Sequence, residues 1–270
     1  MPQFTTAAEA ARAVLLAPTP REKVRAARAA ARAWRLGRLE HRFDAAMPDR
    51  PARPGRPELL PANRMPKRGR GGSERGRIAM LHALAHIEYG AIDLAFDMAG
   101  RFGAQLPRAF VDDWFGIGAD EAIHFALLDR QLKALGSFYG DLPAHDGLWE
   151  AAEETSHDVL ARLAVVPMVL EARGLDVTPA TVERFEAAGD ARSARILIRI
   201  YRDEIRHVGT GTAWFKSVAE SRKLDAVSHW KWLIERHFRG FLKPPFNDSA
   251  RDEAGLSRDF YLGVAVARDV

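Results

Sequence analysis

Residues 112–125, DDWFGIGADEAIHF, decide the fold, because they combine an apolar helix face with one carboxylate and one imidazole. Glu121 and His124 are three residues apart, so both side chains project from the same side of a helix. The stretch 194–208, ARILIRIYRDEIRHV, repeats this spacing with Glu204 and His207. Each pair can therefore present a carboxylate and an imidazole to the same cation.

Two further glutamates complete a repeated pattern. Glu88 precedes Glu121 by 33 residues, and Glu171 precedes Glu204 by the same 33 residues. The body of the chain thus reads as two copies of one helical hairpin. Bundles that hold two metal ions take one Glu from each of two helices and Glu-x-x-His from each of the other two. We predict a dimetal site with these six ligands: Glu88, Glu121, His124, Glu171, Glu204 and His207.

The apolar surroundings of the four glutamates support this prediction. A carboxylate on an apolar helix face is costly unless it is paired or bound to a metal. The alternative is a set of buried ion pairs, with partners such as Arg173 or Arg206. A third Glu-x-x-His pair, Glu154 and His157, lies near a helix start among polar neighbours. We interpret that pair as part of a solvated face and leave it out of the site.

The composition restricts both the chemistry and the location. The chain has 270 residues, 47% of them hydrophobic, and no cysteine. Any metal must therefore rest on His and carboxylate ligands, and thiolate catalysis is excluded. No apolar run reaches the roughly 20 residues of a membrane span, and the first residues do not resemble a secretory signal. We expect a cytoplasmic protein that does not enter a membrane.

Charge divides the chain unevenly. Residues 1–77 hold 18 Lys and Arg against 7 Asp and Glu, whereas the remainder holds 22 against 29. We predict three parts: basic helices with a Pro/Arg-rich wrapping loop over 1–72, a four-helix bundle over 73–222, and a C-terminal helix with a tail packed on the bundle over 223–270. A basic arm can lie on the acidic body of its own chain or meet an anionic partner.

Periodicity and capping residues predict an all-α fold. The expected helices cover 5–16, 20–46, 74–102, 107–135, 143 or 146 to 173, 178–188, 190–222 and 225–239, with one more after residue 247. Gly174 is expected to end the fifth of these helices. Gly116 and Gly118 lie less than two turns before Glu121, and they indicate either a π-bulge or a close approach of two helices.

Several segments resemble a known family. They are PGRPELLPANRMPKRGRG at 54–71, MLHALAHIEYGAIDLAFD at 80–97, DDWFGIGADEAIHF at 112–125 and KPPFN at 243–247. The chain is similar to the ferritin-like superfamily and, within it, to a bacterial family known as domain of unknown function 455. This resemblance covers about residues 50–265. It implies a ferritin-like four-helix bundle with a carboxylate-bridged dimetal centre, and it supplies no substrate.

Five residues near the expected ligands are candidates for supporting roles. His86 and Tyr89 could support the ligands or form a proton path, or they could simply pack between helices. Tyr201 lies one turn before Glu204. We interpret it either as a core residue or as a redox-active tyrosine. Asp120 and Asp203 each precede a ligand, and they could anchor the ligand histidine of the other hairpin.

Three functions fit these observations. The first is an oxygen-activating di-iron oxidase or hydroxylase with an unknown small-molecule substrate and electron donor, with manganese or a mixed pair as the alternative metals. The second is a ferroxidase, or a protein for metal storage or detoxification. The third is an RNA-associated protein with a structural metal. Nucleic acid is disfavoured but stays open, because the basic segment 50–77 has no interleaved aromatic residue for stacking. Trp230 and Trp232 suggest a homodimer surface or a cap on the bundle.

Overall fold

The computed structural model describes residues 4–66 and 73–264 and divides the chain into two compact units, Met1–Trp149 and Glu150–Val270. The described residues form helices and no strand, apart from isolated bridges between Thr6 and Glu40 and between Leu59 and Ala144. The predicted all-α class is therefore confirmed. The predicted three parts have boundaries other than the one between these two units, and this organisation stays a prediction. None of the described helices is both long and apolar enough to cross a membrane.

A long helical hairpin forms the centre of unit 1. Its helices are α3 (Glu74–Phe102) and α4 (Arg108–Ala134), joined through the short turn η2 (Gly103–Gln105). The Ser73 side chain accepts a hydrogen bond from the Gly76 amide and caps α3, as its position predicts. A Cβ atom on Gly118 would overlap the Phe96 ring, so this glycine allows α4 to approach α3 closely. α4 is a continuous α-helix, so the alternative of a π-bulge at Gly116 and Gly118 is wrong.

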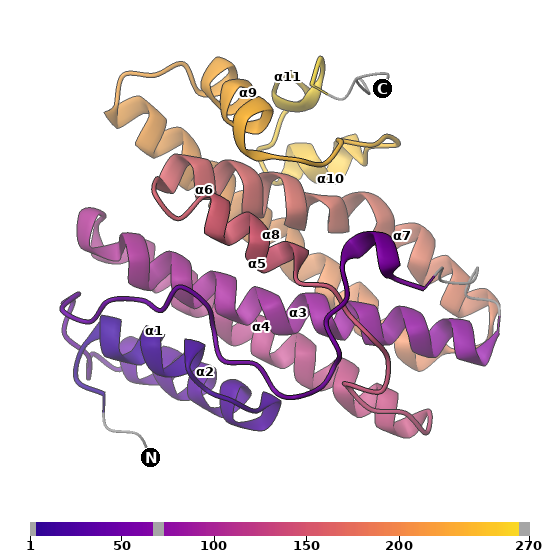
Figure 1. Ribbon diagram of the computed structural model, residues 1–270. Coiled ribbons are helices and arrows are strands. Elements are labelled where there is room, and N and C mark those ends of the chain that lie inside the picture. The colour runs from indigo at the N-terminus through magenta and orange to yellow at the C-terminus, as the bar shows by residue number, and fades with distance from the viewer. Residues whose placement is uncertain (1–3, 67–72, 265–270) are drawn as a thin grey trace. The chain divides into compact units, whose positions relative to one another are not determined.

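The basic N-terminal segment adds two helices to this hairpin (Figure 1). α1 (Ala7–Leu15) packs against α3, and α2 (Pro20–Arg35) packs against α1 and α4. The prediction that the second helix continues to residue 46 is wrong. The helix ends at Arg35 because Gly37 adopts a positive φ of 66°, a conformation that stops a helix and favours glycine. An irregular segment follows, with the single turn η1 (Ala62–Arg64).

A buried ion cluster fixes α2 to α3. Lys23 on α2 and Asp93 on α3 are both fully buried, with 2.5 Å between Lys23 Nζ and Asp93 Oδ1. Lys23 Nζ also donates to the carbonyl oxygens of Val14 (3.1 Å) and Leu15 (3.2 Å). Arg53 donates to the second oxygen of Asp93. Burial lowers the pKa of Lys23, and the charge of Asp93 opposes this shift.

Unit 2 contains a second pair of long helical segments. The first segment consists of α6 (Val159–Val165), the π-helical turn η3 (Val166–Glu171) and α7 (Ala172–Ala187). The second is α8 (Ala191–Ser221), against which all three elements pack. The predicted helix end at Gly174 is wrong, because α7 continues through Gly174 and Pro179. Packing against α8 overrides these two local breaking signals.

The predicted continuous helix is also broken before α6. α5 (Gly147–Glu154) ends there, and Asp158 precedes the first residue of α6. The buried Arg162 side chain donates to the Ala152 carbonyl (2.6 Å) and to the Thr155 hydroxyl (2.9 Å). A side chain of the following helix α6 thus satisfies a carbonyl near the end of α5, where a continuing helix would have used its own amides.

The π-helical turn is the irregular feature nearest an expected ligand. η3 ends at Glu171 and contains Pro167, which has no amide hydrogen to donate. A Cβ atom on Gly211 of α8 would overlap the Pro167 ring, so the glycine permits this close packing. Single π-helical turns are frequent at functional sites.

Shorter helices cover part of unit 2. α9 (Ala226–His237) packs on α6 and α8, while α10 (Asp248–Glu253) and α11 (Arg258–Tyr261) follow it. Arg251 of α10 makes two hydrogen bonds to the buried carboxylate of Asp176, at 2.8 and 2.7 Å. Trp230 is fully buried, whereas Trp232 is half exposed. Trp230 therefore belongs to the core of unit 2, and its predicted place on a dimer surface is wrong, whereas a dimer surface at Trp232 stays a prediction.

Candidate metal centre

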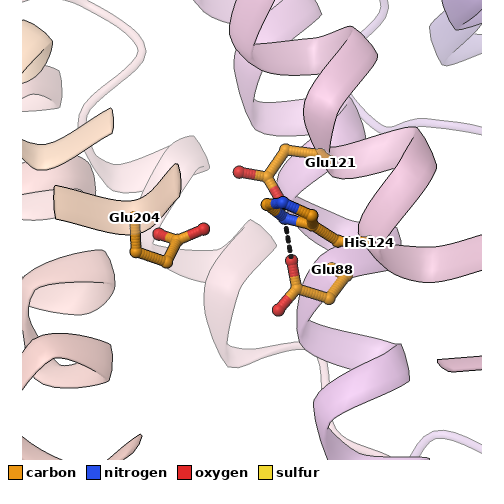
Figure 2. Close-up of side chains that lie close together, drawn as sticks. All are labelled: Glu88, Glu121, His124 and Glu204. Carbon is orange, nitrogen blue, oxygen red and sulfur yellow. Dashed lines mark hydrogen bonds and ion pairs between the residues drawn. The ribbon is translucent and has the colours of Figure 1, made fainter. Parts of the chain in front are cut away.

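Three of the predicted ligands converge in unit 1. Glu88 comes from α3, and Glu121 and His124 come from α4. His124 Nδ1 lies 3.2 Å from Glu88 Oε2 and 3.3 Å from Glu121 Oε2 (Figure 2). One ligand atom from each residue lies within 4.8 Å of the other two. All three side chains are buried, with residue exposures of 5%, 1% and 0%.

The charges in this cluster explain why it suits a cation. Burial raises the pKa of Glu88 well above its usual value, and the nearby charge of Glu121 raises it further. Burial also opposes the charged form of His124, but the hydrogen bonds that His124 donates to the carboxylates of Glu121 and Glu88 outweigh this effect and raise its pKa to about 11. In the metal-free state the proton on His124 thus offsets part of the buried negative charge. A metal ion can take the place of that proton.

The donor set is chemically suited to a transition metal. Carboxylate oxygens and an imidazole nitrogen are ligands for iron, manganese and zinc. A buried pair of carboxylates with a single histidine is also the kind of site at which a bound cation removes an electrostatic penalty. The cluster of Glu88, Glu121 and His124 could therefore hold a metal ion.

The other three predicted ligands lie in unit 2. His207 and Glu204 share one face of α8, with 3.3 Å between His207 Nδ1 and Glu204 Oε1. His207 is fully buried, whereas Glu204 and Glu171 are half-buried. Glu171 ends η3, which packs against α8. The spacing of the sequence thus places two sets of three ligand residues on two helix pairs, and the complete set of six stays a prediction.

The third Glu-x-x-His pair has a different environment. Glu154 accepts a hydrogen bond from Arg239 Nη2 (2.9 Å), and its other oxygen lies 3.8 Å from His237 Nδ1. The exposed His157 ring lies beside that of His237, with 5.0 Å between ring centroids. Glu154 therefore belongs to a surface ion pair.

His86 lies in a hydrogen-bonded pair with a residue that the sequence did not single out. His86 Nε2 is 3.1 Å from the carbonyl oxygen of His145, so this nitrogen donates. His86 Nδ1 therefore accepts from the Tyr139 hydroxyl at 2.9 Å. Burial lowers the pKa of His86 to about 4, which keeps the ring neutral. Tyr139 follows the end of α4 in an irregular segment, where no periodic pattern could have indicated it.

Both candidate tyrosines are held by neighbouring groups. The buried ring of Tyr89 packs on Phe125 and Tyr139, with centroid distances of 5.2 and 5.3 Å. Its hydroxyl has no hydrogen-bond partner among residues 4–66 and 73–264. The hydroxyl of Tyr201 accepts from Asn247 Nδ2 at 3.0 Å. Ring packing holds Tyr89 and a hydrogen bond holds Tyr201, and a role for either residue in supporting the ligands stays a prediction.

The two candidate aspartates lie on different helices. Asp203 of α8 lies 3.5 Å from Arg206 and 3.8 Å from Arg199. Asp120 of α4 lines a groove beside α2. Their suggested contacts to the ligand histidines stay predictions.

Fold and site together define an all-helical protein with a buried Glu and His cluster that could hold a metal ion. The family model described as "Protein of unknown function (DUF455)" matches residues 16–262, and the chain belongs to this family. An uncharacterized protein of Haemophilus influenzae is 42% identical over 211 residues, which cover 76% of this chain and 73% of that protein. No solved structure matches the chain.

Proposed function

We propose that the two sets of ligands act together as one dimetal-carboxylate centre in a ferritin-like bundle, with iron as the bound metal. The observation that carries this proposal is the buried convergence of Glu88, Glu121 and His124. The repeated 33-residue interval supports an equivalent contribution from unit 2. The six residues together follow the ligand plan of dimetal bundles.

The proposed activity is oxidation or hydroxylation of a small organic molecule with dioxygen. The four carboxylates and two imidazoles would hold two ferrous ions, which would supply the reducing equivalents for this chemistry. In unit 1, Trp114 and Phe125 share α4 with the ligands and are 1% and 3% exposed. We propose that these buried side chains keep water away from the ligands, with Met168 and Tyr201 as the corresponding candidates in unit 2. Asp120 and Asp203 are proposed to orient the ligand histidines.

Iron storage is the competing function for the same ligands. A store must pass iron from the centre into a mineral, so it continues to oxidise ferrous iron as long as oxygen is present. An oxygenase without its reductant oxidises the bound pair once and then stops. The two functions therefore differ in how much oxygen they consume.

The test supplies ferrous iron and oxygen well beyond two equivalents per chain and follows oxygen uptake and soluble iron. A single burst, abolished by Glu121→Ala and retained by Glu154→Ala, is the result expected for an oxygenase. Continued uptake into a soluble mineral core would reject the proposed oxidase activity in favour of storage. An equal burst in the wild type and in Glu121→Ala would reject the proposed centre.

A further inference from the structure

Helix α2 exposes a continuous row of arginines. The row follows one helix face at intervals of three or four residues and consists of Arg21, Arg25, Arg28, Arg32 and Arg35, all exposed. From the first to the last, the row spans about 21 Å at the α-helical rise of ~1.5 Å per residue. The opposite face of α2 is buried and carries Lys23 and Trp34, so the arginine face is fixed in orientation.

A groove lies along this row, between α2 and α4. It has a volume of about 880 Å³. Five guanidinium groups line it, those of Arg25, Arg28, Arg32, Arg35 and Arg108. Two carboxylates, Asp112 and Asp120, lie on the α4 side, so positive charge predominates.

The carboxylates of the groove do not neutralise the α2 row. Asp112 accepts a hydrogen bond from Trp34 Nε1 at 2.6 Å and lies 3.9 Å from Arg108 Nε. The Arg108 guanidinium in turn stacks 3.8 Å above the Trp34 ring. Within the described parts of the chain, no carboxylate lies within ion-pair distance of the five α2 arginines.

We infer that this groove binds the phosphate backbone of a nucleic-acid double helix. One strand of B-form DNA carries a phosphate about every 3.4 Å along the axis, so a straight row of ~21 Å runs past about six phosphates. Because the strand turns once in about 10 base pairs, about three of these phosphates face the row. Guanidinium groups bind phosphate oxygens bidentately. The proposal is independent of the metal centre.

The aromatic residues of the groove favour a duplex over a single strand. Proteins that bind single strands stack bases on exposed aromatic rings. The two aromatic residues in this groove, Trp34 and Phe115, are only 2% and 1% exposed. The surface therefore offers contacts to phosphates without a platform for bases, and its binding should be independent of sequence.

The binding test uses the full-length protein and fluorescence anisotropy. The probes are a labelled RNA duplex and a DNA duplex of about 20 base pairs, long enough to exceed the arginine row. A single strand of the same length and a polyglutamate chain serve as competitors. Titrations between about 50 and 200 mM salt give the number of phosphate contacts from the slope of log K against log salt.

Two charge-reversed variants distinguish the contribution of the groove to binding from that of the net charge of the protein. Arg28→Glu/Arg32→Glu changes the groove, and Arg192→Glu/Arg195→Glu makes the same change of charge at exposed positions of α8. The groove variant is expected to bind about tenfold more weakly or worse, with a salt slope smaller by about two. The α8 variant is expected to change the affinity by less than about threefold. Arg28→Gln/Arg32→Gln, with unchanged circular dichroism, tests the same contacts without adding repulsion.

The outcomes are distinct. Tighter binding of one duplex identifies RNA or DNA as the ligand, and equal binding of both also supports the proposal. Three results would overturn it: no salt-dependent binding of either duplex, equal losses in the groove and α8 variants, or stronger competition by the single strand or polyglutamate than by unlabelled duplex. The last result would assign the surface to stacked bases or to an acidic protein.

Discussion

Replacing Lys23 by methionine should destabilise unit 1 and loosen the helix that carries the arginine row. The substitution keeps a long apolar side chain but removes the buried ammonium group, which bonds to Asp93 and to two main-chain carbonyls. Breaking a buried ion pair costs about 3–5 kcal/mol, because the remaining charge is left in a dry environment. Arg53 still pairs with Asp93 in the variant, so we expect a loss near the lower limit, about 3 kcal/mol.

The assay is thermal and urea unfolding of the metal-free protein, followed by circular dichroism. A loss of about 3 kcal/mol in a unit of this size lowers Tm by roughly 6–12 °C. Arg21→Met is the matched control, because Arg21 is exposed on the same helix, and it should change stability by less than about 0.5 kcal/mol. The double variant Lys23→Met/Asp93→Asn should lose less than the sum of the single losses. Equal stabilities of Lys23→Met and Arg21→Met would refute the argument that this ion cluster anchors α2.

Three further results are expected. Glu121→Ala should impair metal binding and Glu154→Ala should leave it intact in equilibrium dialysis; equal losses would show that helix-face burial does not distinguish ligands. Because the pKa of His124 is raised to about 11 in the metal-free protein, metal binding at neutral pH should release its proton, and the affinity for metal should increase as pH rises. Calorimetry in buffers of different ionisation enthalpy measures this proton release. A binding enthalpy independent of the buffer would contradict the expectation. In urea unfolding, Gly211→Ala should destabilise the protein by about 1–3 kcal/mol, because the new Cβ overlaps the Pro167 ring. Gly174→Ala should stabilise the protein by about 0.5–1 kcal/mol, because its Cβ enters open space on α7. A Gly211→Ala variant more stable than Gly174→Ala would refute the packing argument.

The sequence predicted the long helices well where local signals agree. The Ser73 cap and the apolar face of α3 determine its start and course, and the expected range 74–102 agrees with the structure. Predictions failed where contacts between helices determine the structure. The buried Arg162 side chain donates a hydrogen bond across the break between α5 and α6. Packing against α8 stabilises α7, which continues through Gly174. Neither contact leaves a local pattern in the sequence.

The candidate site shows the same division. The three-residue spacing of Glu121 and His124, with Glu88 on the preceding helix, predicted a cluster that the structure brings together. Helical periodicity fixes which face each side chain occupies, so this part needed no tertiary information. Tyr139 could not be predicted, because it lies in an irregular segment and reaches His86 only through the fold.

The central claim is that one chain holds two metal ions, and metal stoichiometry tests it most directly. The measurement is elemental analysis after anaerobic loading with ferrous iron and removal of unbound metal. Four carboxylates and two imidazoles should retain about two ions per chain, the number implied by this ligand plan. Glu121→Ala and His207→Ala should each reduce the amount, and Glu154→Ala should not. Fewer than one ion retained reproducibly by the wild-type protein would contradict the proposed centre.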